Sequence, residues 1–163
     1  MNSDNADSIT RVRDIMTPDV VTLAASTKLE DAARSMSFHR VSGAPVLERG
    51  HIVGVISKTD LVDPKNRGAM SGTVADLMTR ITHAVQPDDP AILAARLMVE
   101  QGIHRVVVVD DRGRLAGIVT AMDVMRAVVE GRSLRDGPPA HGSRDTDPDS
   151  AAYVDLTRVQ VTE

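Results

Sequence analysis

Two short stretches of the sequence place a hydroxyl-bearing residue three positions before a carboxylate. They are GVISKTD (residues 54–60), with Ser57 and Asp60, and GIVTAMD (residues 117–123), with Thr120 and Asp123. A Ser or Thr followed three residues later by an acidic residue, next to apolar residues, is typical of a capping box, in which the two side chains accept free backbone N–H groups at a helix start. Taken alone, each stretch therefore predicts a buried strand that runs directly into a helix.

The composition limits the classes of protein to which the chain can belong. Its 163 residues suit one ordinary domain or two small ones, and a hydrophobic content of 42% is enough for a core. The net charge is -4 without a block of Lys or Arg, and the aromatic residues are only Phe38 and Tyr153, so nucleic-acid binding through phosphates or base stacking is not expected. The absence of cysteine excludes disulfides, thiol catalysis and zinc held by Cys.

The pattern of apolar residues gives no sign of export or of a membrane. Residues 1–14 are polar and lack the apolar core of a signal peptide. The longest uninterrupted apolar runs are a few residues long, far short of a membrane span. We therefore expect a soluble, cytoplasmic protein without a membrane partner.

The elements that position the two Ser/Thr–Asp pairs occur twice along the chain. DIMT (residues 14–17) returns 62 residues later as DLMT (residues 76–79), and a short apolar stretch follows each motif. Helix starts are then predicted at Thr27, which forms a capping pair with Glu30, and at Asp89, which precedes a first-turn proline. Both helices carry the apolar stripe of an amphipathic helix, Leu29, Ala32, Ala33 and Met36 in the first half and Ala91, Ala94, Ala95 and Met98 in the second.

Each half closes with two strands and a second helix. Residues 41–48 and 103–110 are predicted as strands, a polar turn follows each of them, and GVISKTD and GIVTAMD align at an offset of 63. The closing helix is short in the first half (residues 60–62) and longer in the second (residues 122–130). The sequence therefore predicts two repeats, residues 9–68 and 69–131, each in the order strand, helix, strand, strand, helix.

Residues 132–163 differ in composition from both halves. The stretch from Ser133 to Ser150 is rich in Gly, Pro, Ser and Asp and offers little to bury, so we expect a disordered C-terminal tail. Residues 151–161 are more apolar and partly alternating. They either dock as an edge strand, on this molecule or on a partner, or remain a frayed end.

Taken together, the repeated motifs resemble a tandem pair of CBS domains, also called a Bateman module. The residues that carry the resemblance are DIMT and DLMT, the middle strands SGAPVLE and HRVVVVD, and the closing motifs GVISKTD and GIVTAMD, within about residues 9–130. The resemblance implies an α/β (α+β) fold in which two pseudo-symmetric β-α-β-β-α repeats pack together. It also implies clefts between the repeats, which in this family often bind adenine nucleotides.

The same resemblance gives the two Ser/Thr–Asp pairs a second role. In nucleotide-binding relatives the hydroxyl contacts ribose or phosphate and the carboxylate takes the ribose hydroxyls, which implies binding by Ser57 and Asp60 and by Thr120 and Asp123. The chemistry is suitable, because a carboxylate can accept hydrogen bonds from two vicinal hydroxyls and a helix start attracts phosphate. Capping and ligand binding are compatible, so both roles remain open at this stage.

The resemblance extends to residues near the two pairs, each of which also has a simpler interpretation. His104 and Arg105 correspond to a pair that faces phosphate in some relatives, although they would also suit a solvated strand edge. In the first repeat Lys58 could replace them, or it could be an ordinary surface lysine. Small apolar contacts and backbone atoms would shape the slot for adenine, at Ala44, Pro45, Val106 and Val107.

The expected function is regulatory rather than catalytic. The five histidines show no metal-ligand grouping, and no catalytic triad order, paired-carboxylate motif or Walker-type glycine loop occurs, so we expect neither a metal site nor an enzyme, and no cofactor is required. The preferred ligands are AMP, ADP and ATP, with S-adenosylmethionine and dinucleotides as further candidates, and the regulated partner protein is unknown. The alternative is a ligand-free module for homodimerisation or protein interaction.

A homodimer is expected in either case. The closing helix of the second repeat has apolar residues on more faces than one intramolecular contact needs, namely Ala121, Met122, Val124, Met125, Ala127, Val128 and Val129. Members of the resembling family pair through such helices, which supports the same expectation.

Overall fold

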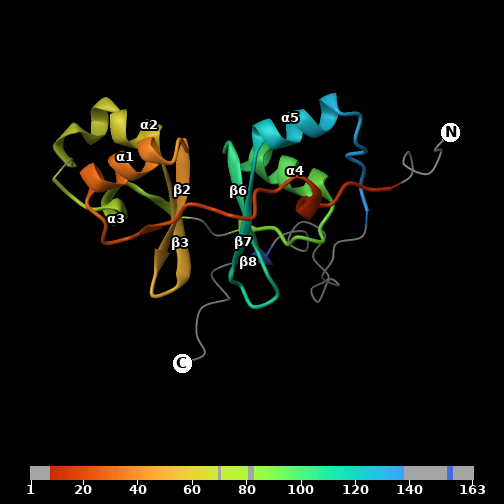
Figure 1. The fold of residues 1–163 in the computed structure, drawn as a ribbon, viewed down its shortest axis with the longest axis horizontal. Coiled ribbons are helices and arrows are strands. Elements are labelled where there is room, and N and C mark those ends of the chain that lie inside the picture. Colours follow the sequence, from red (N-terminus) through yellow and green to blue (C-terminus); the bar gives the residue numbers. More distant parts are fainter. Residues whose placement is uncertain (1–7, 70, 81–82, 138–153, 156–163) are drawn as a thin grey trace. The chain divides into compact units, whose positions relative to one another are not determined.

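The structure is a computed structural model that describes residues 8–69, 71–80, 83–137 and 154–155 (Figure 1). The chain divides into two compact units. Residues 19–81 form one, which we call the first-repeat unit, and residues 1–18 and 82–163 form the other, the second-repeat unit. The segment that leads into each predicted repeat therefore packs with the unit of the other repeat.

The first-repeat unit contains a four-stranded sheet in the order β1-β2-β3-β4. β1 (Leu23–Ala24) is parallel to β2 (Gly43–Glu48), whereas β2 and β3 (His51–Ser57) are antiparallel, as are β3 and β4 (Thr79–Arg80). The helices of this unit are α1 (Leu29–Phe38), α2 (Lys58–Val62), α3 (Val74–Leu77) and the 3-10 helix η3 (Pro64–Ala69). A buried cluster of apolar residues, which includes Leu29, Met36, Val46 and Ile56, forms the core of the unit.

The second-repeat unit has a similar order of elements, but its strands form two two-stranded sheets. Its elements are η2 (Val12–Asp14), β5 (His83–Ala84), α4 (Ala91–Gln101), β6 (Arg105–Val109), β7 (Leu115–Thr120), α5 (Ala121–Val129) and β8 (Val154–Asp155). The two sheets are β5-β8 and β6-β7, both antiparallel, and the residue after β5 is bridged in parallel to β6. The core cluster includes Val12, Leu97, Val106, Val108 and Val119. Mixed α and β elements in two similar units confirm the predicted fold class.

The register of the strand pairs decides which residues share a face. Because side chains alternate along a strand, directly paired residues lie on one face and their neighbours on the other. In the second-repeat unit, the pair Val106–Val119 belongs to the core, so Arg105 and its partner Thr120 lie on the opposite face. In the first-repeat unit, Ala44 and Ile56 belong to the core, and Ser57 pairs with Gly43 on the opposite face.

The glycine of each closing motif makes room for a DxMT segment. A Cβ atom on Gly117 would lie 2.9 Å from the sulfur of Met16 and 2.9 Å from the carbonyl oxygen of Thr17, and Thr17 exchanges two backbone hydrogen bonds with Ile118. Gly54 is approached in the same way by Met78 and Thr79, with the Thr79 oxygen at 2.6 Å. DIMT therefore packs against GIVTAMD, and DLMT against GVISKTD.

Two predicted helix starts are wrong by one residue. The N-cap residues are Lys28 and Pro90, and neither gives a side-chain cap. Thr27 is instead held in backbone hydrogen bonds, donating to Ala24 and accepting from Val74. Asp89 is fully buried, and its carboxylate accepts the N–H of Gln86 at 2.7 Å.

Part of the C-terminal tail is ordered against the second-repeat unit. The Ser133 carbonyl accepts the N–H of Thr10 at 3.0 Å, and Asp136 forms an ion pair with Arg96 at 2.7 Å. β8 pairs with β5 in an antiparallel register. These contacts lie in residues 132–137 and 154–155, and the expectation of a disordered tail stays a prediction. Residues 138–153 and 156–163 lie outside the described residues.

Candidate functional site

Both Ser/Thr–Asp pairs form the capping boxes that their spacing predicts. In the second-repeat unit, Oδ2 of Asp123 accepts the backbone N–H of Thr120 at 2.8 Å and its hydroxyl at 2.6 Å. In the first-repeat unit, Oδ2 of Asp60 accepts the N–H and the hydroxyl of Ser57, both at 2.7 Å. Each hydroxyl oxygen in turn lies 3.3–3.4 Å from the N–H of the Asp. The strand therefore ends and the helix begins within one hydrogen-bonded loop.

The same cap occurs at places that the predicted site does not include. Oδ2 of Asp14 accepts the N–H of Arg11 at 2.7 Å, and Oδ2 of Asp76 accepts the N–H of Thr73 at 2.7 Å and its hydroxyl at 3.1 Å. A capping Asp is thus a general device of this chain for starting short helices. The cap alone gives no reason to infer a ligand, and a ligand would have to use the carboxylate oxygen that the cap leaves over.

That second oxygen of Asp123 lies beside a cation. Oδ1 is 3.7 Å from a guanidinium nitrogen of Arg126, which follows three residues later on the same side of α5, and the Asp123 side chain is 13% exposed. A separation of 3.7 Å is longer than a good charge-assisted hydrogen bond, so the contact leaves lone pairs of Oδ1 open to a donor. Asp123 can therefore cap α5 and accept hydroxyl groups at the same time.

Asp123 and Arg126 line a small polar pocket in the second-repeat unit. The pocket has a volume of about 190 Å³, and its other lining residues are Asp14, Ile15, Ala127, Glu130 and Arg132. A second polar pocket, of about 430 Å³, shares Asp14, Glu130 and Arg132 with it. The two pockets thus form a polar groove between residues 8–15 and the second half of α5. Small-molecule sites usually have about 300–1,000 Å³, so the smaller pocket alone suits part of a nucleotide, such as a sugar with its phosphate.

The structure separates His104 from Arg105. His104 precedes β6, whereas Arg105 is the first residue of that strand. Arg105 shares a face with Thr120, its directly paired residue. His104 is exposed and lines a different pocket, between α4 and α5. Of the predicted pair, only Arg105 therefore lies on the Thr120 face.

The remaining predicted residues fall into three environments. Ala44 and Val106 are buried in the two cores, so their side chains cannot line an adenine slot and only their backbone atoms could contact a ligand. Pro45 and Val107 are buried on the opposite face, the face of Ser57 and Thr120. Lys58 is exposed at the first residue of α2.

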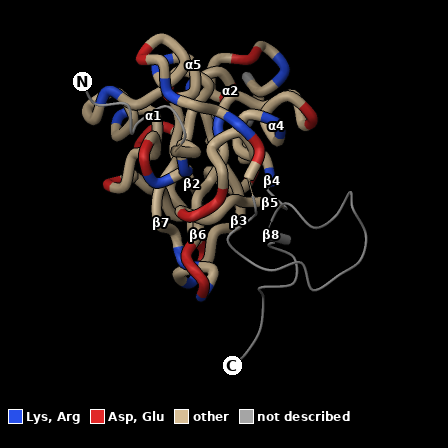
Figure 2. The backbone as a smooth tube through the Cα atoms, turned by 90° about the vertical axis from the view of Figure 1, so that its right-hand side faces the viewer, with Lys and Arg blue, Asp and Glu red and all other residues tan. Residues whose placement is uncertain are grey.

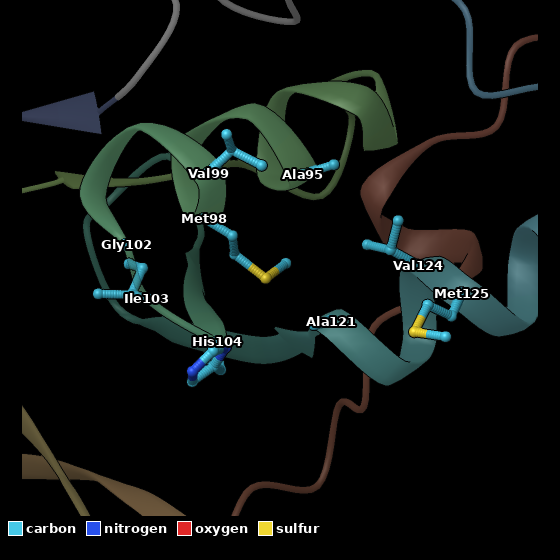
Figure 3. A pocket seen from close by; sticks show the side chains of 9 residues that line it. All are labelled: Ala95, Met98, Val99, Gly102, Ile103, His104, Ala121, Val124 and Met125. Atoms are coloured by element: carbon cyan, nitrogen blue, oxygen red, sulfur yellow. The ribbon is translucent and has the colours of Figure 1, made fainter.

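The pocket between α4 and α5 was not predicted from the sequence. It has a volume of about 390 Å³, and its lining is almost entirely apolar. In Figure 3, Met98 extends from α4 into the space between the two helices, and Val124 and Met125 lie on the α5 side. The apolar stripes on both helices were evident from the sequence. That they leave an open groove depends on how closely the two helices approach each other.

Three further features of the described residues concern the charge distribution, metal-ligand groups and membrane-spanning helices. Acidic and basic residues are interspersed along the backbone without a continuous basic stretch (Figure 2). Within the described ranges, no group of three or more His, Cys, Asp or Glu side chains could hold a metal ion. None of the described helices is long and apolar enough to cross a membrane.

Comparison with known proteins identifies the class of the fold. The two similar α+β units, each with a DxMT segment packed on a G-h-h-S/T-x-x-D motif, define a tandem repeat module. A family model for the CBS domain matches residues 12–64 and 74–130. The chain belongs to the CBS domain family, of which it contains two consecutive repeats.

Relatives in sequence include both small proteins and parts of enzymes. The chain is 32% identical over 155 residues to an uncharacterised protein of Methanocaldococcus jannaschii, covering 72% of this chain and 90% of that protein. It is 31% identical over 119 residues to the inosine-5'-monophosphate dehydrogenase of Korarchaeum cryptofilum, covering 73% of this chain and 24% of the enzyme. The chain thus spans about a quarter of the length of that enzyme.

Solved structures with the same fold carry adenosine-containing ligands. The CBS domain pair of protein MJ0100, in complex with 5-methylthioadenosine and S-adenosyl-L-methionine, matches with a TM-score of 0.69 and 29% identity over 77% of this chain and 100% of that chain. CBSX2 in complex with AMP matches with a TM-score of 0.63 and 32% identity over 74% of this chain and 96% of that chain. CBS pairs similar to this one therefore bind adenine nucleotides and related adenosyl compounds.

Proposed function

We propose that the protein is a regulatory module that binds an adenine nucleotide, AMP, ADP or ATP, and passes its occupancy to a partner protein or to a second copy of itself. The observation that carries the proposal is the geometry of Asp123, which caps α5 with Oδ2 while Oδ1 lies 3.7 Å from Arg126, at a polar pocket that both residues line. A carboxylate oxygen in that position can accept a ribose hydroxyl without loss of the cap. The adenosyl ligands of the two similar CBS pairs support the same class of ligand.

The second repeat is the stronger of the two candidate sites. There Asp123 and Arg126 line the polar groove, and Thr120, which bonds to Asp123, shares a face with Arg105. In the first repeat Ser57 and Asp60 form the same cap, with Lys58 as the nearest cation in the sequence. We therefore propose that Asp123 is the main ribose ligand and that Asp60 has the corresponding role for adenosyl compounds in the first repeat, and we place the protein in the cytoplasm, as its composition suggests.

A panel of nucleotides in a thermal-shift assay tests this function. AMP, ADP, ATP and S-adenosylmethionine are compared with GMP and CMP at equal concentration. A ligand at about 100 times its dissociation constant stabilises the folded state by roughly 2.7 kcal/mol, which raises the melting temperature of a protein of this size by about 5–10 °C. An increase for an adenine compound alone supports the proposal, and an unchanged melt with every compound would contradict it.

The α4–α5 face favours a second role, homodimerisation with or without a ligand. Apolar side chains on these helices are exposed, with Val99 82%, Met125 59% and Val129 86% accessible, and Val99 and Met125 border the apolar pocket between the helices. Large apolar side chains in such number on one face are typical of a protein-interaction site. We propose that two copies pair through this face, and light scattering at tens of micromolar decides between a dimer and a monomer.

A further inference from the structure

The position three residues after the ribose-binding Asp carries opposite charges in the two repeats. In the second repeat it is Arg126, and at the matching offset of 63 in the first repeat it is Asp63. Residues three apart on a helix lie on the same side, so Arg126 is a neighbour of Asp123, whereas Asp63 directly follows the last residue of α2. This difference affects which ligand each repeat accepts, and that inference rests on the function proposed above.

Arg126 is available to an anion. Among the described residues its guanidinium makes no hydrogen bond, and its contact with Asp123 is 3.7 Å long. Glu130, one turn further along the chain, pairs instead with Arg132 at 2.9 Å. Oδ2 of Asp14, the third carboxylate of the pocket, accepts the N–H of Arg11. The carboxylates that line the pocket are thus engaged elsewhere, or touch Arg126 only weakly.

The geometry of a nucleotide suits this arrangement. A ribose whose hydroxyls bind Oδ1 of Asp123 carries its 5′-phosphate only a few bonds away, within reach of a long arginine side chain in the same pocket. Guanidinium is the preferred partner of phosphate, because its planar donors match two phosphate oxygens. We propose that Arg126 binds the phosphate of the nucleotide, so that the second repeat selects phosphorylated adenine nucleotides over uncharged adenosyl compounds.

The first repeat lacks this selection. Oδ1 of Asp63 accepts the N–H of Lys65 at 2.9 Å, which keeps the carboxylate at the end of α2. The negative charge of Asp63, three residues after Asp60 in the sequence, disfavours a phosphate at this end of α2. Lys58 does not compensate, because it lies two residues before Asp60 and a separation of two residues places side chains on different sides of a helix. AMP is therefore expected to bind at the second repeat only.

Isothermal titration of the full chain with AMP and with adenosine tests the assignment. The wild type should bind one AMP per chain, more tightly than adenosine. Arg126→Met keeps the length of the side chain, so it should weaken AMP by about tenfold or more, as expected for a lost charged hydrogen bond, while adenosine changes by less than about twofold. Arg126→Lys should restore part of the affinity for AMP. Arg112→Met, in the turn between β6 and β7, changes the net charge equally and should have no effect.

Each contrary result has a distinct meaning. Equal losses for AMP and adenosine in Arg126→Met, or no loss for AMP, would overturn the role of Arg126 while leaving nucleotide binding intact. Two equivalent AMP sites per chain would overturn the contrast between the repeats. If neither AMP nor adenosine binds the wild type, the proposed function fails, and the assignment of Arg126 fails with it.

Discussion

Replacing Asp123 with alanine should remove two separable contributions, the helix cap and the ligand. Asp123→Ala deletes the acceptor of two short hydrogen bonds from Thr120, at 2.8 and 2.6 Å, in a setting where the carboxylate is 13% exposed. Loss of such a cap costs about 0.5–2 kcal/mol, and the burial argues for about 1.5 kcal/mol. For a chain of this size that lowers the melting temperature of the ligand-free protein by about 3–6 °C.

Asp76→Ala is a matched control for the cap. Asp76 makes the same capping box with Thr73, at 2.7 and 3.1 Å, but lies in the DLMT segment of the first-repeat unit, outside the proposed site. Because its cap is more exposed, Asp76→Ala should destabilise the ligand-free protein somewhat less, by about 1 kcal/mol, which lowers the melting temperature by about 2–4 °C.

Thermal unfolding of both variants with and without saturating AMP separates the two contributions. Asp76→Ala should keep the full increase of about 2.7 kcal/mol at 100 times the dissociation constant, whereas Asp123→Ala should lose it. If Asp123→Ala still gains the wild-type increment, the carboxylate is only a cap. If both variants lose the increment equally, the loss reflects general destabilisation, and the reasoning on Oδ1 is wrong.

Three further predictions concern the packing of the chain. Gly117→Ala should destabilise the protein by about 1–3 kcal/mol in urea unfolding, because its Cβ would lie 2.9 Å from Met16 and from Thr17. The control Gly68→Ala, whose Cβ would have no atom within 4 Å, should change the stability by less than about 0.5 kcal/mol. Equal effects of the two substitutions would refute the close packing at Gly117. Truncation after Gly131 should lower the melting temperature by a few degrees, through loss of the Thr10–Ser133 bond and the Arg96–Asp136 pair. Truncation after Gly137, which removes only the two-residue β8 of the described tail, should lower it less, and equal decreases in both variants would mean that residues after Gly137 hold the tail. Met125→Glu should convert the dimer into a monomer in light scattering, while Arg112→Glu should not, and a dimer that persists in Met125→Glu would exclude the α4–α5 face.

Capping motifs and apolar periodicity predicted most helices and strands, because each of these patterns occurs twice along the chain. The spacing of Ser57 with Asp60 and of Thr120 with Asp123 specified the capping boxes that the structure contains. The helix start at Thr27 was misplaced because a residue far along the chain, Val74, bonds to its backbone. The start at Asp89 was misplaced because its carboxylate accepts the N–H of Gln86, three residues earlier, and does not cap α4. Helix and capping propensities do not take account of such competing hydrogen bonds.

The site was harder to predict, because it depends on which faces side chains share. His104 and Arg105 were treated as one unit, whereas His104 precedes β6 and lines the α4–α5 pocket and Arg105 begins β6 opposite Thr120. Arg126 was overlooked, although its spacing of three from Asp123 on a predicted helix was visible in the sequence. The packing of DIMT against the second repeat, with Met16 over Gly117, is a long-range contact to which no local pattern pointed.

A crystal structure of the protein with saturating AMP tests the central claim most directly. The account predicts that the ribose hydroxyls bind Oδ1 of Asp123 while Oδ2 keeps its hydrogen bonds to Thr120. AMP bound at a place that does not contact Asp123, or an Asp123 that contacts only Thr120 and Arg126 in crystals saturated with AMP, would contradict it.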